Sequence, residues 1–207
     1  MVTWYNQLVK TWIISSALGL CVVIGAVFLY RPAIAPSTTS SGIISRDSTS
    51  QTILGSTAFA DDGLMPTKYT CDGANVVPPL SWSGVPTSSK SLVLIMDDPD
   101  APSGTWNHWV MFNIATSTHS VSEGHEPPGV HGSGSAGNRT YSGPCPPSGE
   151  HHYAFHIYAV ETMLNLPEGS SKSDVLSAIQ AHVIDQATLT ARYARPKLTP
   201  ALLHNGF

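Results

Sequence analysis

Charged side chains are scarce in this sequence of 207 residues, where Lys, Arg, Asp and Glu together make up 12%. Soluble domains usually carry about twice that share. Basic residues are the scarcer sign, and between Asp61 and Asp185 the acidic residues clearly outnumber them. Binding to a nucleic-acid backbone needs Lys and Arg gathered on one surface. The sequence therefore predicts that nucleic acid is not a partner.

Glycine and proline make up part of the share that charged residues have in most soluble domains. The chain holds 17 Gly and 16 Pro, while its hydrophobic share of 42% is ordinary. Such a composition predicts a loop-rich fold and excludes a coiled coil. The length suits one domain of about 100–200 residues with an appendage.

Residues 1–35 contain a long apolar stretch without charge. From Thr11 to Tyr30 no side chain is charged, and a helix of that length spans about 30 Å, the thickness of the hydrocarbon core of a bilayer. The run Ala33-Ile34-Ala35 resembles a signal-peptidase site, so secretion after cleavage near Ala35 is the alternative. Because the apolar run exceeds a typical signal-peptide core and Pro36 follows directly, the sequence favours an uncleaved signal anchor, a transmembrane helix.

Residues 36–54 are rich in Ser and Thr and nearly free of charge. Such a segment cannot offset the entropy of its own ordering, which predicts a flexible tether. Cys71 and Cys145 are the only cysteines beyond the N-terminal segment. The pair is compatible with one disulfide in an oxidising compartment, and two unpaired thiols are the alternative. We expect a single-pass membrane protein whose C-terminal domain is extracytoplasmic, in the periplasm or at the cell surface.

The remaining sequence is typical of a mainly β domain. Residues 91–96, 109–114 and 153–160 are short apolar runs of strand length, each bounded by Gly, Pro, Asp or Ser. Because these runs are not separated by helical crossovers, they favour an antiparallel sandwich over βαβ units.

One helix is predicted near the C-terminus. Ser171 and Asp174 have the spacing of a capping box, and apolar residues then recur at helical spacing to about residue 187. Leu189 to Tyr193 is expected to form a final strand.

Acidic residues are concentrated directly after the apolar run of residues 91–96. Residues 97–102 read Asp-Asp-Pro-Asp-Ala-Pro, and His108 follows six residues later. Three carboxylates within four residues repel one another, and the two prolines stiffen the backbone that presents them. The segment indicates either a functional loop or an exposed turn.

The second segment with candidate functional residues is a rigid Pro/Gly loop over residues 143–149 that runs into a strand. Strand alternation puts His151, Tyr153 and Phe155 on one face, with His152 and His156 on the other. Side chains from the two faces cannot share one ligand.

The motifs of several enzyme classes are missing. The sequence has no H-E-x-x-H pair, no G-x-S-x-G nucleophile motif and no phosphate-binding Walker loop. On a strand, His152 and His156 lie too far apart to chelate one metal ion. We therefore predict no catalytic residue, no metal site and no cofactor, and a binding site in preference to an active site.

Several motifs follow one another in a specific order between Gly55 and Arg195. They are Lys68-Tyr69-Thr70-Cys71-Asp72-Gly73, Pro78-Pro79-Leu80-Ser81-Trp82, the Asp-Pro-Asp-Ala-Pro run, His108-Trp109-Val110, and the Gly-Pro-Cys-Pro-Pro-Ser-Gly loop leading to His151 and Tyr153. In these motifs the chain resembles the phosphatidylethanolamine-binding protein (PEBP) family, in its bacterial and archaeal Raf kinase inhibitor-like branch.

The resemblance implies a fold and a site. The domain covers residues 55–195 and is a β-sandwich of two antiparallel sheets with a C-terminal helix. Residues 196–207 follow it as a tail. The site is a small anion pocket for phosphate or phospholipid head groups, with cis peptide bonds at Asp98-Pro99 and Ala101-Pro102. Its ligand-binding residues, by position, are Asp98, Asp100, His108, Pro144, Cys145, His151 and Tyr153.

We expect neighbouring carboxylates to raise the pKa of the pocket histidines toward the charged form that binds anions. One departure is His152, which stands where the family commonly has Arg, so an ion pair from that position becomes dependent on pH.

The resulting prediction is a non-enzymatic binding protein that modulates a kinase or protease partner, as the family name suggests. Two alternatives stay open. One is a hydrolase or metal-dependent enzyme using Asp98, Asp100, His108 and His151, and the other is a protease inhibitor that acts through a surface loop.

Overall fold

The computed structural model describes residues 51–197. The predicted anchor, most of the Ser/Thr-rich segment and most of the tail lie outside this range, so those predictions stay predictions. Within the described residues, no helix combines the length and the apolar character needed to cross a membrane.

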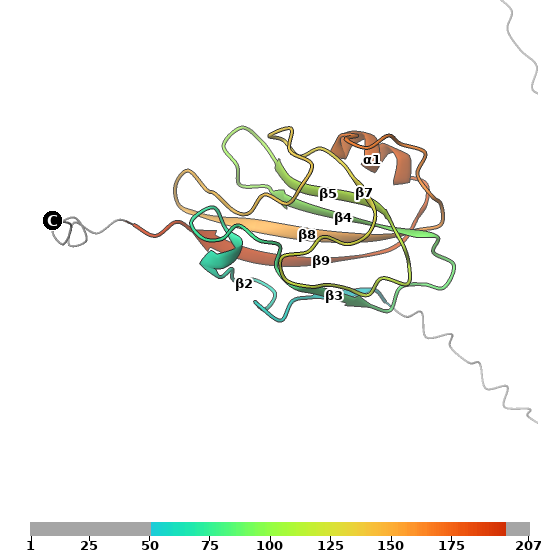
Figure 1. The fold of residues 1–207 in the computed structure, drawn as a ribbon, viewed down its shortest axis with the longest axis horizontal. Helices are drawn as coiled ribbons and strands as arrows, with labels where there is room; N and C mark the ends of the chain where they lie inside the picture. Colours follow the sequence, from blue (N-terminus) through green and yellow to red (C-terminus); the bar gives the residue numbers. More distant parts are fainter. Residues whose placement is uncertain (1–50, 198–207) are drawn as a thin grey trace, which may run out of the picture. The chain divides into compact units, whose positions relative to one another are not determined.

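Two β-sheets form the body of the molecule (Figure 1). The larger has the order β2-β9-β8-β4-β5-β7, and the smaller has the order β1-β3-β6. All pairings are antiparallel except that of β2 with β9, which is parallel. The strands are β1 (Ile53–Gly55), β2 (Gly63–Leu64), β3 (Leu80–Ser83), β4 (Ser91–Asp98), β5 (Trp106–Ile114), β6 (Ser120–Val121), β7 (Val130–His131), β8 (Glu150–Val160) and β9 (Val183–Ala194). The mainly β fold with one C-terminal helix is confirmed.

Strand β4 is buried on both faces, which explains its unbroken apolar sequence. Leu92, Leu94 and Met96 pack between the two sheets, in one cluster with Trp82 of β3. Val93 and Ile95 point to the other side, where they meet the helix. The sheet therefore has a sandwich side and a helix side, and alternation along each strand decides which side a residue faces.

The helix α1 (Lys172–Ile179) begins as its sequence predicts. Ser171 and Asp174 form the capping box, with each side chain bonded to the main chain of the other. The prediction of a helix to about residue 187 is wrong, because α1 ends at Ile179 and β9 begins at Val183. Residues from Val183 onward pair in register with β8, and the hydrogen bonds of that long ladder outweigh the local helical spacing.

Candidate functional site

The predicted site residues lie at one end of the large sheet. Asp98 ends β4, His108 stands near the start of β5, and His151 and Tyr153 open β8. Because β4 runs antiparallel to both neighbours, its last residues lie beside their first ones. The topology thus gathers four polar side chains from three central strands.

A β-bulge directs His108 into this group. Met96 is paired with Trp109, but Asp97 is paired with Asn107, so β5 has one extra residue at His108. Farther along β5, Val110 faces the helix side, and uninterrupted alternation would send His108 there as well. The bulge instead turns His108 to the sandwich side, a common role of bulges near functional sites.

Asp98 and His151 form a buried pair. Nδ1 of His151 lies 2.7 Å from Oδ2 of Asp98, and the two side chains are 8% and 5% exposed. The other Asp98 oxygen, Oδ1, accepts the main-chain N–H of Asp100 at 2.9 Å. This contact fixes the orientation of the His151 ring and leaves its Nε2 as the nitrogen able to meet a ligand.

The same loop corrects one expectation. No peptide bond within residues 51–197 is cis, so the predicted cis bonds at Asp98-Pro99 and Ala101-Pro102 are wrong. The hydrogen bond from Asp100 N–H to the Asp98 side chain is an Asx turn. Such a turn redirects the chain with trans peptide bonds.

His108 is buried and bonded to the main chain. Its Nδ1 lies 2.7 Å from the carbonyl oxygen of Ser142, so Nδ1 donates and Nε2 is left for a ligand. Burial lowers the pKa of His108, although the Ser142 contact and the Asp98 charge act in the opposite direction. The expectation that carboxylates raise the pKa of the pocket histidines is therefore wrong for His108, because desolvation is the larger effect.

Tyr153 stands between the two histidines. Its ring meets that of His108 edge-on at 5.3 Å between centroids and stacks on that of His151 at 6.4 Å. The side chain is fully buried, and its hydroxyl makes no hydrogen bond of acceptable geometry. Burial and then the Asp98 charge raise the pKa of this phenol, so it remains a donor at all ordinary pH values.

Asp100 is not brought into this group. Its side chain is 42% exposed, and Oδ2 accepts the main-chain N–H of His152 at 2.8 Å and faces Nδ1 of the same residue at 2.7 Å. The main-chain bond from His152, followed by the side-chain one, lowers the pKa of Asp100. Asp100 and His152 form a solvent-facing pair beside the site.

The predicted rim loop is held by two contacts from a distant segment. A disulfide joins Cys145 to Cys71 with 5.4 Å between their Cα atoms, and Cys71 N–H donates to the Pro144 carbonyl at 3.0 Å. Gly143 packs so closely that an added Cβ would lie 2.1 Å from the Tyr69 carbonyl oxygen. The loop conformation therefore depends on chain contacts far from it in sequence.

Sequence reasoning missed Ser142, whose carbonyl orients His108. Main-chain atoms carry no side-chain signature, so no motif could have indicated it. The predicted site includes Asp98 but not Asp97. Asp97 points to the helix side, where its Oδ2 lies 2.5 Å from Nζ of Lys172 and 3.8 Å from Nε2 of His156.

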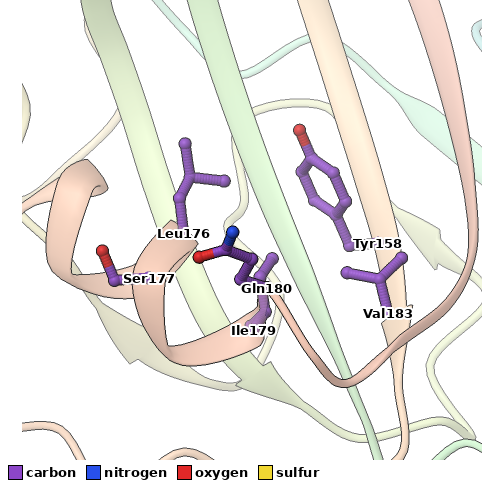
Figure 2. Close-up of a pocket in the computed structure, with 6 residues that line it drawn as sticks. All are labelled: Tyr158, Leu176, Ser177, Ile179, Gln180 and Val183. Atoms are coloured by element: carbon purple, nitrogen blue, oxygen red, sulfur yellow. The ribbon is translucent and has the colours of Figure 1, made fainter. Parts of the chain in front are cut away.

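The described residues show no cluster of three or more His, Cys, Asp or Glu side chains able to hold a metal ion. Cavities of about 330, 370 and 580 Å³ lie elsewhere and are lined by other residues. The first of these borders α1 and is mostly apolar (Figure 2). The geometry of the four converging side chains fits a small polar group that offers hydrogen-bond acceptors to Tyr153 and the histidines.

Comparisons with known proteins cover the same part of the chain. A family model described as phosphatidylethanolamine-binding protein matches residues 55–194. A UPF0098 protein of Methanothermobacter thermautotrophicus is 51% identical over 144 residues, which are 67% of this chain and 95% of that protein. A Mycobacterium tuberculosis protein provisionally named lipoprotein LppC is 39% identical over 143 residues, 68% of this chain and 71% of that protein.

Two solved structures are similar. One is the crystal structure of a PEBP homolog, CT736, from Chlamydia trachomatis, with a TM-score of 0.69 and 38% identity, covering 71% of this chain and 99% of that one. The other is Escherichia coli YbcL, described as a new member of the mammalian PEBP family, with a TM-score of 0.66 and 29% identity, covering 70% of this chain and 99% of that one.

Proposed function

This chain belongs to the phosphatidylethanolamine-binding protein family, and from that premise we propose that it is a non-enzymatic binding protein for phosphate or phospholipid head groups. The ligand would bind among His108, His151 and Tyr153, beside Asp98. The name of the UPF0098 relative states no ligand.

The observation that carries the proposal is the buried hydroxyl of Tyr153, which has no hydrogen-bond partner of good geometry although Asp98 and the main chain of Cys145 lie beside it. Buried polar groups in proteins nearly always have a hydrogen-bond partner, and an exception calls for a missing water or ligand. This hydroxyl is buried, and the adjoining histidine rings each have one nitrogen already engaged. A phosphate oxygen would accept from the phenol and from a protonated Nε2.

The low pKa of His108 sets the protonation that binding requires. At neutral pH its Nε2 is an acceptor, so a phosphate group would either donate its own P–OH to that nitrogen or bind together with a proton. Only binding together with a proton makes the affinity fall as the pH rises above the pKa of His108. Donation by the P–OH of phosphate does not depend on that pKa, and glycerophosphoethanolamine, a diester, has no P–OH to donate.

Isothermal titration with inorganic phosphate and with glycerophosphoethanolamine tests the proposal. His108→Ala and Tyr153→Phe should each weaken binding by about tenfold, the effect of losing one hydrogen bond to a charged group. His119→Ala is the matched control, because His119 is exposed and lies on the turn before β6, far from the site. Unchanged affinity in His108→Ala would refute the proposed site.

The two ligands separate two sources of the same chemistry. Equal affinity for both would indicate a phosphate site, whereas preference for glycerophosphoethanolamine would indicate that an ammonium group is also recognised. Asp100 is the carboxylate available for it, because Asp98 is occupied by His151. Phosphoester turnover that is lost in Asp98→Ala would instead favour the enzyme alternative.

We further propose that the protein is anchored by residues 1–35 as a single-pass membrane protein, with its β-domain outside the cytoplasm. The uncharged run from Thr11 to Tyr30 supports the anchor. The Cys71–Cys145 disulfide supports an oxidising compartment, and so does the similar mycobacterial protein with a lipoprotein name. The intact mass of the membrane-extracted chain tests this against cleavage near Ala35.

A kinase or protease partner is part of the same proposal, on the strength of the family's Raf kinase inhibitor-like branch. Pull-down with the full chain, repeated with saturating phosphate, tests whether a bound partner depends on the pocket. A protease inhibitor that acts through a surface loop would keep full inhibition in Tyr153→Phe.

A further inference from the structure

One peptide unit fixes the orientation of the His108 ring. Its carbonyl oxygen, that of Ser142, lies 2.7 Å from Nδ1 of His108. Its N–H, that of Gly143, donates to Oδ1 of Asn75 at 2.8 Å. The C=O and the N–H of a trans peptide unit lie in one plane and point in opposite directions. This unit is therefore bonded on both sides, to His108 on one and to Asn75 on the other.

The same contact decides which nitrogen of His108 carries the proton. A carbonyl oxygen only accepts hydrogen bonds, so Nδ1 is the protonated nitrogen of the neutral ring and Nε2 presents a lone pair. Burial lowers the pKa of His108 below the ordinary value of 6.5, so the neutral ring is the main form at pH 7. The pocket thus offers an acceptor at Nε2 and a donor at the hydroxyl of Tyr153.

Asn75 opposes the reverse arrangement of this peptide unit. If the unit turned over, its N–H would face His108, so that Nδ1 would accept and Nε2 would carry the proton. The carbonyl of Ser142 would then meet Oδ1 of Asn75, and two acceptors repel each other. Asn75 has a positive φ of 55°, which Asn adopts more readily than most residues. The Asn75 side chain therefore keeps Nε2 of His108 an acceptor.

The charged side chains around the pocket are acidic. Burial has the largest effect on the pKa of His108 and on that of Tyr153, and each charged side chain that also affects one of them is a carboxylate. These carboxylates are Asp97, Asp98 and Asp100. Asp98 itself faces His151 at 2.7 Å. Because an imidazole carries at most one positive charge, the pair of Asp98 and His151 has no net positive charge.

The lysines and arginines of residues 51–197 do not offset this acidity. The range holds seven such residues, and five of them form ion pairs with carboxylates outside the pocket. These five are Lys68, Arg139, Lys172, Arg192 and Arg195. Lys90 lies at the other end of β8, where its N–H donates to the Val160 carbonyl at 2.8 Å, and Lys197 is exposed beyond the end of β9. A doubly charged anion in the pocket would therefore have no lysine or arginine of this range to compensate it.

Two properties of the pocket thus define the phosphate group that fits it. The lone pair of Nε2 requires a donor on the ligand, and a P–OH group supplies one. The lack of a basic side chain favours a ligand with a single negative charge. A phosphodiester has one charge but no P–OH, and sulfate has two charges and no donor. A singly protonated phosphomonoester meets both conditions.

We propose that the pocket selects phosphate groups that keep a P–OH, in phosphomonoesters and in inorganic phosphate, over phosphodiesters and sulfate. Asn75 is the positioning residue for this selection, because it holds the peptide unit that orients His108. The selection rests on the phosphate site proposed above and narrows its ligands to one class. A phospholipid head group joined through a diester is then a weaker ligand than a phosphomonoester.

Calorimetric titration of the full chain at pH 7 with inorganic phosphate, dimethyl phosphate and sulfate tests the selection. Dimethyl phosphate has the single charge of a protonated monoester without its P–OH, so it isolates the effect of the donor. Phosphate should bind about tenfold more tightly than either of the other two, because only phosphate makes the hydrogen bond to Nε2. Equal affinity for phosphate and dimethyl phosphate would overturn the proposal.

The pH dependence should also differ between the ligands. As the pH falls through the pKa of His108, Nε2 gains a proton and becomes a donor. The affinity for dimethyl phosphate should then rise, by up to about tenfold per pH unit, while the affinity for phosphate changes less. His108→Gln is the control, because Asp98, His151 and Tyr153 face the same ligand and Asp97 lies on the other side of the sheet. A rise of the same size in His108→Gln would assign it to those groups and contradict the proposal.

Two substitutions test Asn75. Asn75→Gly removes the acceptor without backbone strain, because Gly adopts positive φ freely. It should reduce the ratio of the affinities for phosphate and dimethyl phosphate by about fivefold, the effect of one lost hydrogen bond. Asn75→Asp keeps an acceptor and should keep the ratio. Ala74→Gly is the matched control, because Ala74 is exposed in the same loop and the change leaves Asn75 in place.

Nitrogen-15 spectra of the histidine-labelled chain report the tautomer of His108 directly. At pH 7 the proton should be on Nδ1 in the wild-type protein and in Asn75→Asp, and a signal from the form protonated at Nε2 should appear in Asn75→Gly. Tyr153→Phe should weaken both ligands alike and leave their ratio unchanged, because its hydroxyl donates to an oxygen that both carry. An unchanged ratio and tautomer in Asn75→Gly would refute the role of Asn75.

The outcomes keep the selection apart from the phosphate site itself. Phosphate and dimethyl phosphate that bind equally, and are lost together in His108→Ala, would refute the selection and leave the site standing. Absence of binding for all three anions would refute both. If Asn75→Gly does not fold, the wild-type spectrum decides, because a proton on Nε2 of His108 at pH 7 overturns the proposal by itself.

Discussion

The carboxylate of Asp98 and the imidazole of His151 are 2.7 Å apart and almost fully removed from water. A buried charged group is costly unless a partner compensates for it. Neither side chain could therefore be buried at low cost without the other. The pair also connects the end of β4 to the start of β8 at the site.

Removing one member of this pair should destabilise the fold. We expect Asp98→Ala to reduce the free energy of unfolding by about 3 kcal/mol, because His151 is left buried without its partner. Urea denaturation measures the change. Asp100→Ala is the control, since that carboxylate lies at the surface, and an equal loss in both variants would contradict this account of the pair.

The buried histidine His108 should make stability depend on pH. Burial lowers its pKa in the folded protein below the ordinary value of 6.5, so the unfolded chain takes up the proton more readily. The neutral ring thus contributes stability that is fully present above pH 6.5 and is lost as the pH falls through the folded pKa. Thermal melts from pH 7 to pH 5 should show a smaller decrease for His108→Gln than for the wild-type protein. An identical decrease would assign the effect to other groups, among them His156, whose pKa burial also lowers.

Opening the disulfide should weaken both the fold and the pocket. Cys71 and Cys145 are separated by 74 positions in the sequence, and cross-links that close loops of this size contribute roughly 2–5 kcal/mol. We expect Cys71→Ser/Cys145→Ser to lower stability by that amount and to reduce phosphate affinity, because the rim at Pro144 loses its attachment. Denaturation and titration of the double variant measure the two effects, and the wild-type protein in reductant should behave the same way. Full affinity in the double variant would show that the rim is held without the bond.

Gly143 should not tolerate even one added carbon. In Gly143→Ala the new Cβ would lie 2.1 Å from the Tyr69 carbonyl oxygen, so the main chain of one loop must move. The variant should lose about 2 kcal/mol or more of stability, and phosphate affinity should fall with it. Gly55→Ala is the control, because its added Cβ meets nothing within 4 Å, and its melting temperature should be unchanged.

Local patterns were enough for much of this domain. The alternation that places His151 and Tyr153 on one face of β8 is confirmed by their burial, with His152 exposed between them. The capping box of Ser171 and Asp174 is confirmed for the same reason. Both depend on residues a few positions apart, whose geometry the backbone fixes before any tertiary contact forms.

Other features depended on chain segments that are distant in sequence. The helical spacing after Ile179 gave way to β9, because β9 pairs with β8 at eleven positions and the main-chain groups facing β8 are bonded along that whole length. His108 reached the pocket through a bulge that only the register against β4 reveals. Desolvation of His108, which reversed the expected direction of its pKa shift, is likewise a property of the packed state.

By itself the sequence determined the three central strands β4, β5 and β8, the side-chain chemistry of the site and the uncharged segment before the domain, since these follow from residue type and short-range periodicity. Only the tertiary structure decided which partner each carboxylate of this segment meets. Asp97, Asp98 and Asp100 look alike in the sequence, yet the first binds Lys172 on the helix side, the second is buried against His151, and the third meets His152 at the surface. The pleat and the turn after β4 point neighbouring side chains in different directions, and the partner that each one meets comes from another part of the chain.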